Sequence, residues 1–390
     1  MAAKAALPIM APMDQTFRYM VRQQAWPLVF AVLAISGIVW MAQSLRFVDL
    51  VLNRGLPMST LFELAGLVLP MYTSIFLPIV LFATVVFAYN RMVMDSELVI
   101  WRAAGLSPMR LAAPALALSG LVMLICYALN LYYMPAAYRH FKDLQFAVRT
   151  NYAQVLLREG AFNEIGNGVT VYVRERAGNG ELLGIFIHDR RENGEPVTML
   201  AERGALVQTE EGPRVVMANG NRQLVKKDRK DLSILYFDRY TLDLKSKEDS
   251  TGPRWREPRE RFLGELFHPS TTGPNAQTNQ RFRLKLLAEG HQRLSSPLLS
   301  PAFVLIALVA LLTGEFNRRG QMRRVAGACA AMVLVQSLSI ALHSLASISA
   351  ALAVLMYLLP VSVTGVCLWL LMRQPRQSHA LVDVPAPARA

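Results

Sequence analysis

The stretch LAGLVLPMYTSIFLPIVLFATVVFAY, residues 64–89, runs for 26 positions without a charged side chain. A helix needs about 20 apolar residues to cross the hydrocarbon core of a bilayer, so this stretch predicts a transmembrane helix. Five further stretches come near that length, which predicts an α-helical membrane protein with six spans. The other predicted spans are residues 26–45, 111–133, 298–314, 325–347 and 351–372.

The composition indicates the same class of protein. Hydrophobic residues make up 53% of the 390 positions and charged residues 18%, whereas soluble domains carry about 25% charged residues. The three cysteines lie singly inside apolar runs, so we interpret them as small buried hydrophobic residues rather than a disulfide framework or a metal site. Residues 134–297 carry 26 basic and 21 acidic side chains, and the rest of the chain carries 15 and 7. Because the positive excess lies beside the predicted spans, it indicates topology rather than nucleic-acid binding.

Basic residues of the short loops predict the orientation. Thirteen fall on one side of the spans, and only Arg46 and Arg54 fall on the other when the long insert is left out. Under the positive-inside rule both termini are cytoplasmic and the insert is outside. No cleavable signal is expected, and Met1 and Met13 stay open as alternative starts. The thirteen are Lys4, Arg18, Arg22, Arg91, Arg102, Arg110, Arg318, Arg319, Arg323, Arg324, Arg373, Arg376 and Arg389.

The insert between the third and fourth spans is predicted to be mainly β-structure. The segment GVTVYVRER alternates valines with other side chains, and short runs such as LSILYFDRYTLDL follow between turns rich in Gly, Asn and Glu. This pattern predicts an antiparallel, jelly-roll-like domain, with a sandwich or barrel as alternatives. A linker is expected over 254–278, and a helix over 279–294 that continues into the fourth span. The predicted division is 1–133, 134–297 and 298–390.

The stretch MDSELVIWRAAGLSP, which follows the second span, predicts one short helix over residues 95–106. Glu97 falls in its first turn, where a carboxylate meets the positive end of the helix dipole, and Gly105 suits its end. Leu98 and Trp101 share a face that we expect to be exposed at the cytoplasmic surface. The residues alone leave two interpretations open: a loop with its Trp among lipid headgroups, or a helix that docks into a soluble partner.

Four stretches resemble the LptF/LptG family, the membrane subunits of an ABC exporter that extracts lipopolysaccharide from the bacterial inner membrane. They are FRYMVRQ before the first span, DSELVIWRAAGLSPMRL after the second, LLAEGHQRLSSPLLSPAFVLIALVALL at the start of the fourth and NRRGQMRRV after it. The segments DSELVIWRAAGLS and YFDRYTLDL are more similar to LptF than to LptG. Trp101 stands where the family often has Met, which changes the bulk of the short helix and keeps its glutamate.

This resemblance implies a permease subunit of an inner-membrane transporter, with no enzymatic activity and no cofactor of its own. The expected partners are a cytoplasmic LptB-like ATPase dimer, an LptG-like permease, LptC-like and LptA-like periplasmic proteins and lipopolysaccharide, without nucleic acid. The short helix would dock into the ATPase through Glu97, Leu98 and Trp101, with Arg91 and Arg102 as companions by proximity. The chain contains no GxxxxGK[ST] string, so it has no phosphate-cradling loop to bind ATP itself.

Basic residues at the outer ends of spans are predicted to meet the phosphates of lipopolysaccharide at headgroup level. The alternative is that they are snorkelling side chains or partners of Asp49 and Asp143. The resemblance favours Arg46, because the first span of these permeases lines the lipid chamber. The predicted contacts are Arg46, Arg54, Arg139 and Lys142.

Two functions other than transport are compatible with parts of this pattern. A non-transporting inner-membrane scaffold with a protein-binding β domain stays open as the alternative. An enzyme is disfavoured, because His188, His268 and His291 lie far apart in no recognisable motif. His343 is the one ionisable group well inside a span, and we interpret it as a neutral histidine hydrogen-bonded to a neighbouring helix.

Overall fold

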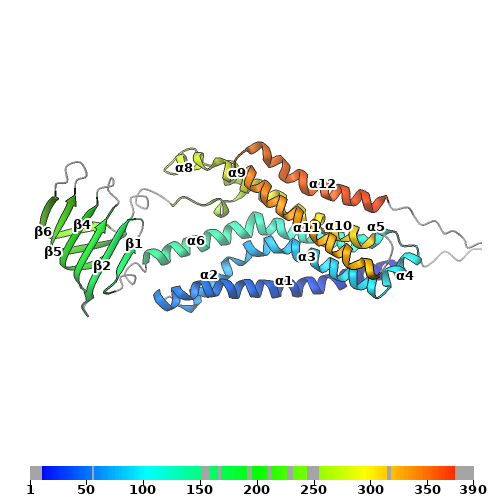
Figure 1. Ribbon diagram of the computed structural model, residues 1–390, viewed down its shortest axis with the longest axis horizontal. Helices are drawn as coiled ribbons and strands as arrows, with labels where there is room; N and C mark the ends of the chain where they lie inside the picture. The colour runs from blue at the N-terminus through cyan, green and yellow to red at the C-terminus, as the bar shows by residue number, and fades with distance from the viewer. Residues whose placement is uncertain are drawn as a thin grey trace, which may run out of the picture.

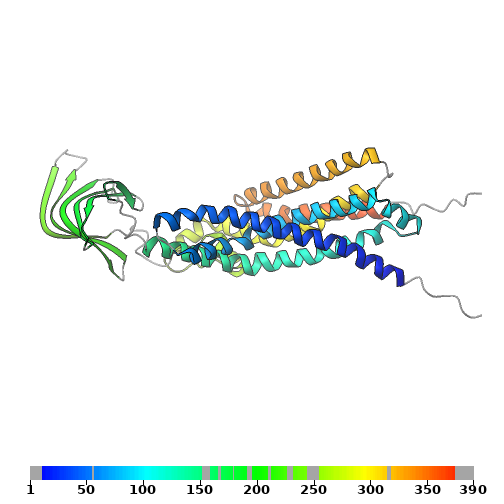
Figure 2. The same cartoon turned by 90° about the horizontal axis from the view of Figure 1, so that it is seen from below.

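The computed structural model describes residues 11–54, 57–151, 159–165, 168–178, 180–190, 196–209, 212–225, 232–243, 254–313 and 318–373. Helices lie along the long axis of an elongated molecule, and a six-stranded sheet lies at one end (Figures 1 and 2). The short helix α4 (Glu97–Ala103) lies at the opposite end from the sheet (Figure 1). Thus the predicted fold class, helical spans with an inserted all-β domain, is confirmed. The predicted cytoplasmic positions of Lys4, Arg376 and Arg389 and the alternative start Met1 lie outside the described residues.

Six helical segments of the described chain are long and apolar enough to cross a membrane, in agreement with the sequence. The first, fifth and sixth are built on α1 (Ala11–Arg54), α11 (Arg318–Ala346) and α12 (Ala353–Met372), the last preceded by a 3₁₀ turn (Ala350–Leu352). The spans are Gln15–Val48, Met58–Met94, Pro108–Phe146, Arg283–Leu312, Gln321–Ala346 and Ala350–Met372.

The other three spans are composite. In the second, α2 (Met58–Leu67) and α3 (Leu69–Met94) meet at Val68, two residues before Pro70, which has no N–H to continue the helix.

In the third span, α5 (Pro108–Ala128) passes through a π-helical turn (Leu129–Tyr133) into α6 (Met134–Asn151). In the fourth, α9 (Arg283–Ser295) and a 3₁₀ turn (Ser296–Leu298) lead into α10 (Leu299–Leu312), so the short apolar run gains length as predicted.

The core of the helical bundle surrounds α10. This is the most buried span, and Phe303 and Leu308 are fully enclosed by neighbouring helices. Tyr89 of α3 is also fully buried, and its hydroxyl donates to the carbonyl of Leu111 on α5 at 2.6 Å. By contrast, α1, α11 and α12 keep most of their apolar side chains exposed, as helices in contact with lipid or with another subunit would.

The chain between sheet and fourth span forms short helices rather than an extended linker. A 3₁₀ turn (Pro258–Glu260) packs against α6 and α9, and α7 (Leu263–Phe267) packs against α9. After α8 (Ala276–Arg281) the chain enters α9. This segment, residues 254–282, therefore braces the ends of the third and fourth spans that lie toward the sheet, and we call it the bracing segment.

The sheet is a meander in which every strand pairs antiparallel with its neighbours in the sequence. One face is apolar and buried, with Val171, Ile187, Met199 and Met217 at its centre. No second layer covers this face in the described chain. The side chains are shielded because the sheet curls around them (Figure 2). The strands are β1 (Phe162–Ile165), β2 (Val169–Arg176), β3 (Leu182–Asp189), β4 (Val197–Thr209), β5 (Gly212–Val225) and β6 (Leu232–Asp243).

A crease crosses this sheet from β2 to β6. The paired positions on either side keep one register, but the pairing skips a row of five residues: Arg174, Gly184, Glu202, Asn219 and Asp238. Gly184 and Asn219 have φ values of 63° and 52°, in the left-handed region. Across the crease the buried positions of β4 change from Ala201 to Gly204, a shift of one residue in the alternation. Each of these strands thus has one unpaired residue on the crease, which shifts its alternation by one position. This shift bends the sheet and keeps the buried side chains of both arms facing the same interior.

The cysteines do not all follow the prediction. Cys126 and Cys367 are buried, as expected. Cys329 is exposed on α11, because this helix packs against the bundle along a narrow stripe only. The interpretation of Cys329 as a buried hydrophobic residue is therefore wrong.

Candidate functional site

Helix α4 forms a sharp connection between α3 and α5. It begins after Ser96, whose φ is 62°, and the chain leaves it through Gly105, whose φ is 85°. A glycine adopts that left-handed conformation without steric cost, which confirms its predicted place at the helix end. The hydroxyl of Ser107 then caps α5 by accepting from the backbone N–H of Arg110 at 3.4 Å.

The face of α4 that we expected at the surface is turned inward. Leu98 is fully buried in the core of the bundle, and Trp101 packs partly against that core. The prediction that Leu98 is exposed is therefore wrong. Val99 and Ile100 carry the exposed apolar surface instead, with 42% and 64% of their area accessible. A seven-residue helix has too few turns for its sequence to fix which side meets the bundle.

Arg102 anchors α4 to the fourth span. Its guanidinium donates a hydrogen bond to the carbonyl of Leu312, the last residue of α10. A cation at this position meets both an unpaired carbonyl and the negative end of the helix dipole. Burial lowers the pKa of Arg102, but arginine stays protonated at physiological pH.

Three further contacts fix α4 and the turn before it. The hydroxyl of Tyr19 on α1 donates to Glu97 at 3.2 Å, and its ring meets Trp101 edge-on at 6.2 Å between centroids. Arg91 forms an exposed ion pair with Asp95 at 3.5 Å. The structure thus brings Glu97, Trp101 and Arg91 together at the end of the bundle where α1, α3 and α4 meet.

At the other end of the bundle, the predicted lipid contacts divide into two pairs. Arg46 is exposed on α1, and it makes no ion pair or hydrogen bond with any described residue. Arg54 is the last residue of α1, and its side chain lies outside the described part. Nearby, Glu63 of α2 pairs with His140 of α6 at 3.0 Å.

Arg139 and Lys142 instead reach the bracing segment. Arg139 pairs with Glu265 at 2.9 Å, and its guanidinium lies 4.8 Å from the ring centre of Phe262. Lys142 pairs with Glu257 at 2.8 Å. Neither residue pairs with Asp143 among the described contacts, contrary to one prediction from the sequence, and the side chain of Asp49 lies outside the described part.

The partner of Asp143 is Arg254, at 3.0 Å. This arginine also pairs with Glu260, which is fully buried, at 2.6 Å. Burial alone would lower the pKa of Arg254, but its hydrogen bonds to the two carboxylates outweigh that effect and raise the pKa. The pairs join α6 to the bracing segment.

A buried arginine on α9 completes this arrangement. Arg293 is 2% exposed, and it donates to the backbone carbonyls of Arg261 at 2.6 Å, Pro258 at 3.0 Å and Arg259 at 3.1 Å. It also donates to the carboxylate of Glu289 at 3.2 Å. Sequence reasoning missed this residue, because three of its four partners are backbone carbonyls that lie more than thirty positions away.

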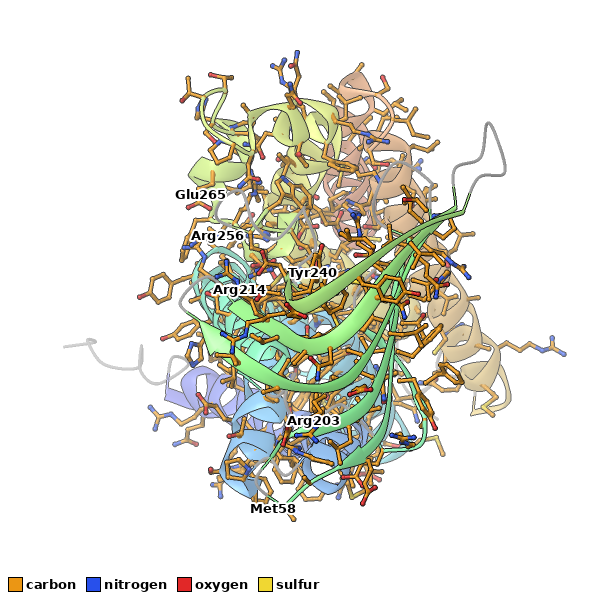
Figure 3. All side chains as sticks on the ribbon, turned by 90° about the vertical axis from the view of Figure 1, so that its left-hand side faces the viewer. Met58, Arg203, Arg214, Tyr240, Arg256 and Glu265 are labelled. Carbon is orange, nitrogen blue, oxygen red and sulfur yellow. The ribbon has the colours of Figure 1, made fainter. Side chains whose placement is uncertain are left out.

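The interior of the sheet is the other candidate contact surface. Figure 3 views the sheet end, with Arg203, Arg214 and Tyr240 on the strands and Met58 and Glu265 marking the bundle behind them. Val171 lies at the centre of the apolar face. An apolar concavity open along its edges can accept hydrocarbon chains while polar groups stay in water. Among the described residues no cluster of His, Cys, Asp or Glu could hold a metal ion.

Comparison with known proteins decides the family. Residues 18–374 match the family described as lipopolysaccharide export system permease LptF/LptG. The chain belongs to the LptF/LptG family. An uncharacterised protein of Rickettsia prowazekii (strain Madrid E) is 26% identical over 333 residues, which cover 85% of this chain and 91% of the relative. The permease protein LptF of Escherichia coli (strain K12) is 24% identical over 271 residues, which cover 68% and 73%, and LptF of Shigella flexneri gives the same values.

Membership of the LptF/LptG family confirms the resemblance read from the sequence, and the relatives named LptF agree with the closer similarity to LptF. With its six apolar spans, this LptF/LptG protein is a multi-pass protein of the inner membrane. The structure does not confirm the predicted hydrogen bond between His343 and a neighbouring helix. The Nδ1 atom of His343 is buried and has no hydrogen-bond partner in the described chain.

Proposed function

We propose that this chain is the LptF-like permease subunit of an ATP-driven exporter that takes lipopolysaccharide from the inner membrane toward a periplasmic bridge. The observation that carries the proposal is a family match along nearly the whole chain, together with α4 at one end and an apolar concave sheet at the other. A force received at α4 would act on the spans, and lipid would leave along the sheet.

Helix α4 is proposed to contact a cytoplasmic ATPase dimer. The exposed side chains of Val99 and Ile100 offer the apolar surface, and Glu97 lies beside them for a polar contact. Leu98 and Arg102 would act from within, because they join the helix to the bundle and so pass a displacement to α10. Trp101 and Arg91 hold the same region in place through Tyr19 and Asp95, in addition to any contact with the ATPase.

The partners at the other surfaces follow from exposure. The largely unburied helices α1 and α11 are proposed to face a second, LptG-like permease across a shared lipid chamber. In the sheet, β6 is an edge strand with Tyr236 78% exposed, so it can accept a strand from an LptC-like periplasmic domain. This assembly requires both termini and α4 in the cytoplasm and the sheet in the periplasm, the orientation predicted by the basic residues.

For lipid phosphate, Arg46 is the first candidate, because its guanidinium is exposed at the outer end of α1 and has no described partner. Arg54 is proposed to act at the same level. Arg139 and Lys142 could bind phosphate only after their ion pairs with Glu265 and Glu257 break, so any contact with lipid phosphate there would follow that rearrangement.

The test is site-specific photocrosslinking in cells, with the reactive amino acid at Ile100, Arg46 or Val171 and a control at Leu124. An exporter should give an ATPase adduct from Ile100 and lipopolysaccharide adducts from Arg46 and Val171. Leu124 is 62% exposed on the membrane face of α5 and should give neither. Protein adducts without lipid at both Arg46 and Val171 would refute the conduit and favour the scaffold.

A further inference from the structure

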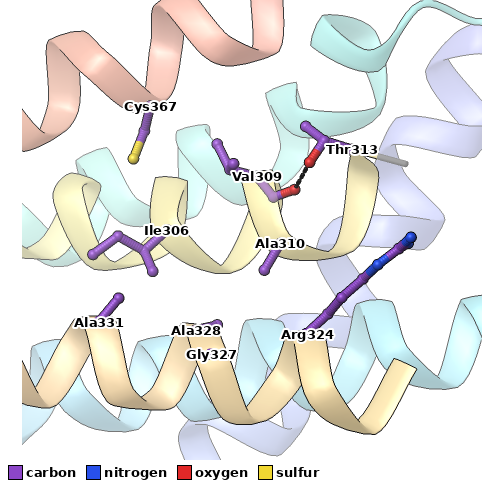
Figure 4. Close-up of a pocket in the computed structure, with 9 residues that line it drawn as sticks. All are labelled: Ile306, Val309, Ala310, Thr313, Arg324, Gly327, Ala328, Ala331 and Cys367. Atoms are coloured by element: carbon purple, nitrogen blue, oxygen red, sulfur yellow. Dashed lines mark hydrogen bonds between the residues drawn. The ribbon is translucent and has the colours of Figure 1, made fainter. Parts of the chain in front are cut away.

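A groove lies between α10, α11 and α12 (Figure 4), near the end of α10 that Arg102 of α4 contacts. Its volume is about 410 Å³, within the range of roughly 300–1,000 Å³ that is usual for small-ligand sites. Ile306 and Ala310 of α10 form one wall and Cys367 of α12 contributes to another. The lining is almost entirely apolar, so the groove suits a hydrocarbon chain.

Small residues on α11 create this space. Gly327, Ala328 and Ala331 face α10 where longer side chains would fill the gap. A Cβ atom added at Gly327 would meet nothing within 4 Å, so the volume is unoccupied by the protein at this point. Because a helix is about 10 Å across, the groove is too small for a transmembrane helix of a partner.

One charged side chain lines the groove. Arg324 extends along it toward Thr313, where α10 has just ended (Figure 4). Arg324 is partly buried, and its guanidinium forms no hydrogen bond or ion pair with any residue that the structure describes. A planar guanidinium beside an apolar surface is well suited to a phosphate group.

The surroundings strengthen the preference for an anion. Helix α11 starts with Arg318 and Arg319, carries Arg323 next to Arg324, and has no acidic residue in its first turn. Each basic residue near a membrane surface attracts anionic lipid by about 1 kcal/mol. The groove therefore combines an apolar slot with a positive end at headgroup level.

We propose that this groove binds an anionic phospholipid of the cytoplasmic leaflet, with one acyl chain between α10 and α11 and its phosphate against Arg324. The site is separate from the export route, because it lies at the α4 end of the bundle. The proposal rests on the predicted orientation, which makes that end cytoplasmic, and it does not depend on the nature of the exported lipid. The bound chain would keep α11 apart from α10.

Native mass spectrometry of the chain purified with its co-expressed partner subunits tests the site, with phosphatidylglycerol and phosphatidylcholine as probes. The wild type should prefer phosphatidylglycerol. R324Q should weaken phosphatidylglycerol binding roughly fivefold to tenfold and phosphatidylcholine binding less, because the choline cation of that lipid offsets the charge of its phosphate. R323Q removes the same charge from an exposed neighbour outside the groove and should change binding less than about twofold. G327L fills the open volume and should reduce binding of both lipids.

Three results would overturn the proposal. Equal losses in R324Q and R323Q would show a diffuse surface charge, and equal binding of the two lipids to the wild type would show ordinary lipid contact only. Loss of partner subunits from G327L, with no change in lipid binding, would assign the groove to a protein neighbour. Lipid binding is read without ATP or lipopolysaccharide, so a failure here is distinguishable from a failure of the proposed export function.

Discussion

Replacing Arg293 by methionine tests whether the bracing segment is held to the membrane helices by one buried side chain. The guanidinium makes four hydrogen bonds, three of them to backbone carbonyls of the segment from Pro258 to Arg261. Methionine fills a similar volume but donates nothing. The three carbonyls and the carboxylate of Glu289 would lose their donor in a site that is 2% exposed.

The expected cost follows from the environment. Hydrogen bonds to a charged group contribute about 1.5–3 kcal/mol each, but bonds from one side chain do not add independently. Breaking a buried ionic arrangement by removing one partner costs about 3–5 kcal/mol. A change of about 1.4 kcal/mol is tenfold in an equilibrium constant, so local opening should rise by roughly a hundredfold to a few thousandfold.

Limited proteolysis with trypsin measures this opening, because cleavage after Arg261 requires the segment to leave α9. Arg261 is 7% exposed, so its cleavage rate follows the population of the open form. R293M should be cut there at least a hundred times faster than the wild type, and R256M should be unchanged. The control removes an exposed arginine of the same segment whose side chain has no hydrogen-bond or ion-pair partner among the described residues. If a correctly inserted R293M protein were cleaved after Arg261 at the wild-type rate, the hydrogen bonds of Arg293 would contribute less than about 1 kcal/mol to holding the bracing segment.

Three further predictions concern α4 and the sheet. L98A should lower the free energy of unfolding by about 2–5 kcal/mol, because it leaves a cavity in the core. I100E should leave the free energy of unfolding unchanged and abolish co-purification of the ATPase. Equal losses of stability in the two variants would contradict the assigned faces of α4. R102Q should weaken the attachment of α4 to Leu312 and reduce lipid-stimulated ATP hydrolysis in the assembled complex more than it reduces ATPase binding; unchanged stimulation would refute this coupling role. G220V should unfold the sheet, because a side chain there overlaps a carbonyl of β4, and circular dichroism would measure the loss of β-structure. G178V should leave the sheet folded, since a Cβ there meets open space. A folded sheet in G220V would contradict the close approach of β4 and β5.

The spans and the short helix could be predicted because long apolar runs and charged interruptions are local signals. The orientation of α4 could not, since Leu98 and Ile100 are both apolar and only the packed bundle selects between them. Arg139 and Lys142 were identified as basic residues at the outer end of a helix. Their partners lie more than 110 positions along the chain, so no local pattern could reveal that they brace a segment.

The strands were visible in the sequence as alternating residues, but the shape of the sheet was not. In β5 the residues that face the sheet interior stand at odd positions as far as Met217 and at an even position at Leu224. The alternation therefore shifts by one residue between them. A single strand with such a shift reads as an ordinary irregularity. Only the registers show that the shifts in successive strands fall on one line.

The crease has a consequence for how the width of the sheet interior can change over evolution. The angle between the two arms depends on backbone dihedral angles at positions such as Gly184 and Asn219, and no helix of the bundle takes part in it. Exchanging residues along this line would widen or narrow the opening while the spans and α4 keep their contacts. If lipid passes this opening as proposed, a lineage whose lipid carries bulkier or more numerous chains can refit the aperture by local substitutions, without rebuilding α4 or the spans.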